Sequence, residues 1–113
     1  HLCGAPIILQ MIIDNKKYKT NKNIINVMTA ASPPPPSVLE DIEKSGFSVT
    51  HVYGLTESYG PAVICEWKPE WNEIKSSSKK AILKSRQGVN YPALDFLEVF
   101  NPKNMKPVKR DGK

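Results

Sequence analysis

Four consecutive prolines, Pro33 to Pro36, restrict the fold of this 113-residue chain more than any other feature of its sequence. Proline lacks a backbone N–H, so the run cannot continue a strand ladder, but a proline suits the first turn of a helix. Ile24 to Met28, just before the run, is a short β-branched segment that predicts a buried strand. Ser37 to Lys44, just after it, predicts a helix with three apolar residues on one face: Val38, Leu39 and Ile42.

A second predicted strand comes after this helix. Phe47 to Tyr53 alternates and is rich in β-forming residues, Gly46 before it suits a left-handed helix cap, and Gly54 is expected to end it. A strand, a connecting helix and another strand imply a parallel pair joined by a right-handed crossover. Parallel strands need cover on both faces, so the expected fold class is α/β, a partial, parallel-rich sheet with flanking helices.

The other segments give weaker signals. Pro6 to Asn15 predicts a helix whose apolar face consists of Ile7, Ile8, Met11 and Ile12. A strand, a loosely packed helical region and another strand are expected at Ala62 to Trp67, Pro69 to Arg86 and Leu94 to Phe100. Polar residues predict a loop at 15–23 and turns at 101–106 and 111–112. Roughly two or three helices and three to five strands are too few for a complete doubly wound sheet.

Composition narrows the possible functions. The net charge is +5, but the lysines are scattered and no aromatic residues interleave with them, so a solvated surface is favoured over a nucleic-acid interface. No apolar run approaches the ~20 residues that span a bilayer. Cys3 and Cys65 lack a metal-ligand spacing, and two free buried thiols are favoured over a disulfide. The chain begins at His1 without a methionine, which suggests a cut at both ends.

Two segments directly after predicted strands combine residue types suited to a nucleotide. Thr29 to Pro33 has small side chains that let a ring or a phosphate approach the backbone, although it also reads as a tight turn. Tyr53 to Glu57 offers an aromatic ring, a glycine, a hydroxyl and a carboxylate, which can stack on a base and hold magnesium. The alternative is an ordinary turn in which Thr56 caps the next helical segment.

These segments resemble the AMP-forming acyl-CoA synthetases of the adenylate-forming, or AMP-binding, superfamily. Tyr53 to Glu57 looks like the Tyr-Gly-x-Thr-Glu signature of that family, and Val27 to Pro36 looks like its strand and Gly/Ala-rich adenine loop. Four further segments are similar to the plant acyl-activating branch, which includes aromatic- and short-chain acyl-CoA ligases: residues 1–6, 67–71, 84–89 and 105–113.

The resemblance covers essentially the whole chain and implies an internal fragment of the large N-terminal domain of such an enzyme. Residues 1–68 would hold the βα units with the adenine loop and the Tyr-Gly-x-Thr-Glu motif. Residues 69–113 would hold a helical stretch and then a strand and turn region.

The resemblance also implies site residues. Those implied for nucleotide binding come from the two loops: Ala30, Ala31, Ser32, Tyr53, Gly54, Leu55 and Thr56. Tyr53 would pack on the adenine, Thr56 would donate to a phosphate, and Glu57 would help to bind magnesium. Thr56 and Glu57 are therefore the catalytic candidates. The acyl-pocket candidates are Val52, Pro61, Gln87 and Gly88.

Four other positions need comment. Ala30 and Ala31 stand where the family usually has glycine, and each methyl group narrows the space above the backbone. His51 either edges the acyl pocket or, as favoured, packs within its strand, and His1 is expected to be structural at a strand end.

The implied function is part of an ATP-dependent acid–CoA ligase that adenylates a carboxylic acid and passes the acyl group to coenzyme A. ATP, Mg²⁺ and CoA would take part, with no nucleic acid and no transmembrane segment. The isolated chain is expected to be inactive, because the phosphate loop and the lid with its lysine are not found in it and the rest of the enzyme chain is needed. The alternative is a truncated or degenerate, non-catalytic binding or interaction module. An intracellular location is expected, with peroxisome and cytoplasm both left open.

Overall fold

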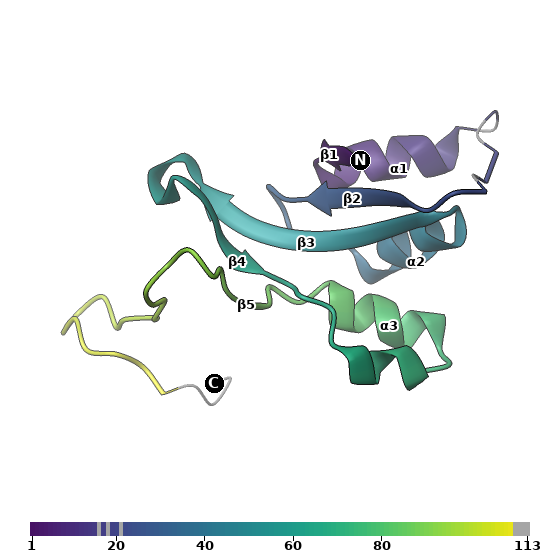
Figure 1. The fold of residues 1–113 in the computed structure, drawn as a ribbon. Helices are drawn as coiled ribbons and strands as arrows, with labels where there is room; N and C mark the ends of the chain where they lie inside the picture. Colours follow the sequence, from purple (N-terminus) through teal and green to yellow (C-terminus); the bar gives the residue numbers. More distant parts are fainter. Residues whose placement is uncertain (16, 18, 21, 110–113) are drawn as a thin grey trace.

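The structure is a computed structural model that describes residues 1–15, 17, 19–20 and 22–109. The described helices are α1 (Pro6–Asp14), α2 (Pro36–Lys44) and α3 (Ser77–Lys84), with short 3₁₀ turns η1 (Thr56–Ser58) and η2 (Pro69–Glu73). The described strands form one five-stranded sheet in the order β1 (Leu2–Gly4), β2 (Ile25–Thr29), β3 (Phe47–Leu55), β4 (Gly60–Ile64) and β5 (Val89–Asn90) (Figure 1). The expected α/β fold class is confirmed.

The proline run does what its chemistry predicts. Pro36 opens α2, where the missing N–H costs nothing, and the helix begins with a bond from the Leu39 N–H to the Pro35 carbonyl at 3.2 Å. Gly46 after α2 has φ 92°, the left-handed conformation expected of a helix cap. β2 and β3 on either side pair in parallel, with Val27 opposite Val49, as the strand–helix–strand pattern predicts.

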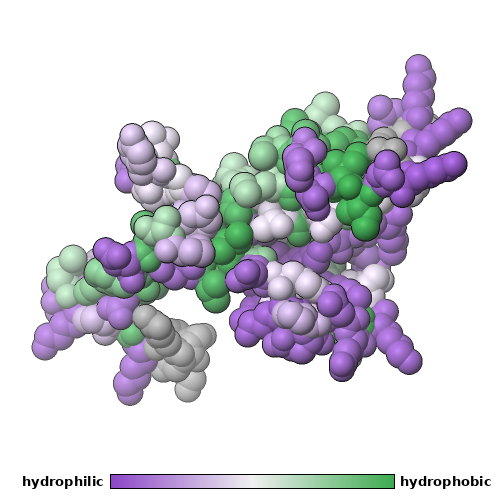
Figure 2. All heavy atoms as spheres, viewed as in Figure 1, coloured by the Kyte–Doolittle hydropathy of each residue, from purple (hydrophilic) through white to green (hydrophobic). Residues whose placement is uncertain are grey.

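The sheet changes direction at β3. β1, β2 and β3 run parallel, whereas β4 pairs with β3 antiparallel and β5 with β4 antiparallel. β3 and β4 therefore form a hairpin, whose tip extends beyond the ends of β1 and β2 and projects from the body of the molecule (Figures 1 and 2).

One face of the sheet carries the core. Buried side chains from all three helices meet the same face of β2 and β3 in a single cluster: Leu9, Val27, Val38, Leu39, Ile42, Phe47, Val49 and Ala81. On the opposite face Cys3 and Met28 are neighbours in register and both are exposed. In the described part of the chain, helices thus cover one face of the parallel strands and not the two that we expected.

The face that α1 buries differs from the one predicted. Leu9 is fully buried and Ile12 of the predicted face packs against the core, whereas Ile7 and Met11 are each 63% exposed and give α1 a hydrophobic outer surface (Figure 2). Apolar spacing marks a possible contact face, but α1 carries apolar residues on more than one side, and the strands and α2 cover only the side of Leu9.

The strand predicted at Leu94 to Phe100 is wrong. The described chain has only an isolated bridge between Phe100 and Pro107 there, and Phe96 and Val99 are each 70% exposed. β-forming residues need a partner strand and a packing surface, and this segment has neither in the described residues. The turn at 101–106 does form, since the Asn101 N–H bonds to the Lys106 carbonyl at 2.9 Å.

Other boundaries move by a few residues. β3 continues through Gly54 to Leu55 and does not end at that glycine. β4 begins two residues before the predicted strand at Ala62 to Trp67 and ends three residues before its end. β5 was not predicted, and of β1 only a strand end at His1 was expected, because two and three residues carry too little pattern. The expected turn at 111–112 and parts of the loop at 15–23 lie outside the described residues. No helix in the described part of the chain is long and apolar enough to cross a membrane.

Candidate functional site

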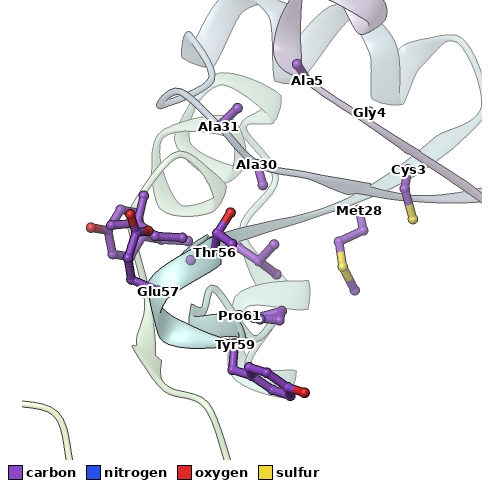
Figure 3. A pocket seen from close by; sticks show the side chains of 15 residues that line it. Cys3, Gly4, Ala5, Met28, Ala30, Ala31, Thr56, Glu57, Tyr59 and Pro61 are labelled. Atoms are coloured by element: carbon purple, nitrogen blue, oxygen red, sulfur yellow. The ribbon is translucent and has the colours of Figure 1, made fainter.

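A cleft of about 1050 Å³ opens at the carboxyl ends of the parallel strands (Figure 3). Three stretches line it: residues 3–5 at the end of β1, residues 28, 30 and 31 at the end of β2, and residues 52–57 and 59–61 of the β3–β4 hairpin. Parallel strands bring their carboxyl ends to one edge of a sheet, which is where α/β proteins place ligands. The cleft therefore joins the two segments that the sequence singled out.

The loop after β2 contributes a strained residue. Ala31 has φ 83°, a left-handed conformation that clashes with the Cβ of an L-residue, and its side chain is exposed at the cleft. Ala30 just before it has no such conformation. The methyl of Ala31 is therefore held at a backbone position that glycine adopts without cost.

Gly54 is required by a close crossing of the hairpin strands. A Cβ at Gly54 would lie 2.2 Å from the carbonyl oxygen of Gly60, because a bulge between Tyr53 and Gly54 brings the two strands together. The glycine of the motif thus keeps the hairpin closed, which fixes where the residues after it emerge.

Thr56 and Glu57 occupy the tip of the hairpin, and both are exposed. Leu55 is the N-cap of η1, so the alternative in which Thr56 is the capping residue is wrong. In Figure 3 the side chain of Thr56 points to the side of the cleft lined by Ala30. No group of three or more metal-ligating side chains occurs among the described residues, and Glu57 is the one carboxylate that lines the cleft.

Apolar side chains form the remaining wall of the cleft. Val52 is only 4% exposed, and Pro61 lies across the hairpin from Gly54. Cys3 and Met28 extend side by side from neighbouring strands toward the same space (Figure 3). Tyr53 is 45% exposed at the cleft, so its ring is available to a ligand.

Three candidate residues lie outside this cleft. Ser32 comes directly after Ala31 but does not line it, and Gln87 and Gly88 line a different cavity with residues of β5. Gly88 has a structural reason to be glycine, since φ is 96° and a Cβ would lie 2.0 Å from the Ile64 carbonyl oxygen.

The histidines and tryptophans lie away from the cleft. His51 is 2% exposed and its Nδ1 lies 3.0 Å from the Arg86 carbonyl oxygen, so it is a packed strand histidine, the favoured of the two interpretations. Because a carbonyl only accepts, Nδ1 carries the proton. His1 is exposed next to the first residue of β1. Trp67 and Trp71 pack edge to face, with their ring centroids 5.2 Å apart.

The two cysteines are free, but only one is buried. Cys65 is 8% exposed with its Sγ 3.4 Å from the Leu83 carbonyl oxygen, and burial raises the pKa of its thiol. Cys3 is exposed, which corrects the expectation of two buried thiols.

Sequence reasoning missed Cys3 and Met28, which line the cleft, and Ser58, which lies in the turn beside it. Cys3 belongs to a strand too short to predict, and the pattern that places Met28 in a strand does not say which face it occupies. Ser58 comes directly after the Tyr-Gly-x-Thr-Glu motif, and its hydroxyl contacts both strands of the hairpin. A serine in a tight turn was the available signal.

Comparisons with known proteins place these features in context. No family model matches the chain. It is 46% identical over 115 residues to the acetate–CoA ligase CCL3 of Humulus lupulus, and 43% identical over 116 residues to the peroxisomal acetate/butyrate–CoA ligase AAE7 of Arabidopsis thaliana. It is 44% identical over 112 residues to the 2-methylpropanoate–CoA ligase CCL4 of Humulus lupulus. These alignments cover 99% to 100% of the chain but only 20% of each relative, so the chain spans about a fifth of their length.

Proposed function

We propose that this chain is part of an ATP-dependent acid–CoA ligase. Its whole length is similar to one segment of the plant acyl-activating enzymes and CoA ligases, as its motifs predict. Such an enzyme forms an acyl-adenylate and pyrophosphate from a carboxylic acid and ATP, and then passes the acyl group to coenzyme A. The observation that carries the proposal is the single cleft lined by both the Ala30–Ala31 loop and the Tyr53–Glu57 tip.

In this proposal the nucleotide lies along the polar side of the cleft. The exposed ring of Tyr53 packs against the base, for which an aromatic face and a flat ligand are suited. The small side chains of Ala30 and Ala31 let the base approach the backbone after β2. The hydroxyl of Thr56 donates a hydrogen bond to a phosphate oxygen. This bond stabilises the negative charge that shifts on the phosphate during adenylation.

Glu57 fits a magnesium ion that accompanies the nucleotide. Magnesium in nucleotide sites is held by one or two carboxylates together with phosphate oxygens and water. Glu57 supplies one exposed carboxylate at the rim of the cleft, and no hydrogen bond or ion pair from the described residues occupies it. When bound, the ion would neutralise phosphate charge, and the role of Glu57 is to hold it.

A short aliphatic acid is the substrate class we propose. CCL3, AAE7 and CCL4 are described as ligases of acetate, of acetate or butyrate, and of 2-methylpropanoate. The apolar wall of Val52 and Pro61 suits a small hydrocarbon group placed beside the phosphates. Gln87 and Gly88 line a separate cavity in this chain, so their part in an acyl pocket would depend on residues beyond it.

The relatives narrow the location of the protein only in part. AAE7 and a probable acyl-activating enzyme of Arabidopsis thaliana that is 40% identical are both described as peroxisomal. We propose a peroxisomal or cytoplasmic enzyme, and fluorescence microscopy of the tagged full-length protein distinguishes the two.

Pyrophosphate release by the full-length protein tests the function. With ATP and magnesium, release should require a carboxylic acid, and acetate, butyrate and 2-methylpropanoate should be compared. Glu57→Gln should lower the rate by ~10²-fold, because it weakens the hold on the magnesium ion that would neutralise the phosphate charge. Glu70→Gln, an exposed glutamate of η2 far from the cleft, is the matched control and should retain activity. Absence of acid-dependent release from the unaltered protein with every acid would refute the proposal.

A further inference from the structure

The turn that carries Thr56 and Glu57 is closed by the next residue, a serine. β3 ends at Leu55, η1 covers Thr56–Ser58, and β4 begins at Gly60. The two candidate side chains are exposed, whereas Ser58 is half-buried and points back into the hairpin. The orientation of the exposed pair therefore depends on what holds this short turn.

The hydroxyl of Ser58 reaches both strands of the hairpin. Its Oγ accepts from the Leu55 N–H at 2.9 Å, on the β3 side. Its single proton can go to the Gly60 carbonyl oxygen at 2.6 Å, on the β4 side, or to the Leu55 carbonyl oxygen at 2.9 Å. One side chain thus satisfies backbone groups at both ends of the turn.

The same turn contains a backbone conformation that needs support. Tyr59 has φ 61° and ψ 21°, the left-handed region, which is unfavourable for a non-glycine residue. Its ring is fully exposed and contributes no packing energy, so hydrogen bonds must stabilise the conformation. The Tyr59 N–H bonds to the Thr56 carbonyl at 3.1 Å, and the Ser58 hydroxyl holds the Gly60 carbonyl beyond it.

The Gly60 carbonyl is also the group that fits against Gly54. Its oxygen lies 2.2 Å from where a Cβ on Gly54 would stand, so a small shift of this carbonyl changes the crossing of the strands. Ser58 therefore couples the turn to the glycine of the motif, and loss of its hydroxyl frees the carbonyl to rotate.

We propose that Ser58 is a positioning residue. It orients Thr56 for the phosphates of the nucleotide and Glu57 for the magnesium ion, and its own side chain contacts neither the phosphates nor the ion. This inference rests on the proposed function. Neither the motif nor the residues assigned to the site include Ser58, and its role comes from its contacts with Leu55 and Gly60.

The test compares Ser58→Ala and Ser58→Thr in the full-length protein. Ser58→Ala loses the bond accepted from the Leu55 N–H and the bond donated to a carbonyl, and water replaces part of both. It should raise the magnesium concentration for half-maximal pyrophosphate release by roughly two- to tenfold. Ser58→Thr keeps the hydroxyl and should restore a value close to that of the unaltered protein. Both variants should unfold at nearly the original temperature, because water can reach the exposed turn and satisfy its backbone groups.

Ser85→Ala is the matched control. Ser85 at the end of α3 also bonds to a carbonyl three residues earlier, Ile82 at 2.8 Å, but it lies away from the cleft. Its variant should leave the magnesium dependence unchanged. Amide hydrogen exchange supplies a readout besides activity: in Ser58→Ala the Leu55 and Tyr59 amides should exchange faster.

The outcomes separate the two claims. If the unaltered protein releases no pyrophosphate with any acid, the proposed function fails. If it does, but Ser58→Ala shows unchanged magnesium dependence and unchanged exchange at Leu55 and Tyr59, the positioning role fails. An equal loss of activity in Ser58→Ala and Ser58→Thr would also overturn it, because the hydroxyl would then not be the reason.

Discussion

At the scale of single residues, backbone conformation constrains the cleft as much as side-chain chemistry does. Ala31 at φ 83° and Tyr59 at φ 61° are left-handed non-glycine residues that line the cleft, and Gly54 is dictated by a carbonyl of the facing strand. Left-handed residues of this kind concentrate at functional sites, where surrounding contacts maintain them.

Ala31→Gly should stabilise the protein. Glycine removes the left-handed clash but adds entropy to the unfolded chain, so we expect a net gain of up to ~1 kcal/mol in the free energy of unfolding. Urea denaturation measures it, with Ala30→Gly as the neighbouring control, where only the entropy cost applies and stability should fall. A gain in neither variant would show that Ala31 is not strained.

At the scale of elements, a hydrogen-bonded carboxylate joins α2 to α3. Glu40 Oε1 accepts from Ser77 Oγ at 2.6 Å, its Oε2 accepts from Ser78 Oγ at 2.9 Å, and Lys44 Nζ lies 2.9 Å from Oε1. The two serine hydroxyls and Lys44 lower the pKa of Glu40 from 4.5 to about 2. The start of α3 is thereby fixed to the side of α2.

Glu40→Gln should destabilise the protein near neutral pH and have less effect in acid. The folded pKa lies below the ordinary value, so the stabilisation is present above pH 4.5 and is lost as pH falls toward about 2. The free energies of unfolding of the variant and of the original protein, measured from pH 7 to pH 2, should converge over that window. Asp41→Asn, which loses only a 3.8 Å contact with Lys44, should have the smaller effect at pH 7. Parallel curves across the window would contradict the role of Glu40.

The sequence predicts an element well when the segments that it packs against are its neighbours in the sequence. β2, α2 and β3 were predictable because the proline run, the amphipathic helix and the alternating strand agree, and each packs against the next. The segment at Leu94 to Phe100 has strand residues but no neighbouring strand in the described chain, so its pattern misled.

The site was predictable to the extent that a motif carried it. Ala30 and Tyr53 to Glu57 line one cleft, because the carboxyl ends of the parallel strands β2 and β3 meet at one edge of the sheet. Gln87 and Gly88 lie elsewhere, since their distance from the motif depends on the path through η2 and α3, which no pattern fixes. Ser58 could be recognised only from the atoms that its hydroxyl reaches.

At the scale of the whole molecule, the cleft lacks positive charge. Its lining includes no lysine or arginine among the described residues, while Glu57 is negative. ATP is a polyanion, and its transfer chemistry requires cationic groups or metal ions around the phosphates. The chain spans about a fifth of the length of its relatives, and under the proposed function we expect such groups in the parts of those proteins that it does not cover.

The isolated 113-residue chain should therefore be inactive. We expect no acid-dependent pyrophosphate release from it and no binding of magnesium–ATP tighter than about 10 μM by calorimetry, since the phosphate charge stays unneutralised. Circular dichroism establishes that the sample is folded, and the full-length protein is the positive control. Turnover by the isolated chain would mean that the groups lining the cleft suffice.

The unequal exposure of the two thiols allows a probe to be attached selectively at the cleft. Cys65 is shielded and its raised pKa keeps it protonated, whereas Cys3 opens onto the cleft beside Met28. Alkylation depends on access and on the thiolate. A maleimide dye should therefore label the 113-residue chain at Cys3 first, and its fluorescence would report what enters the cleft without any engineered mutation.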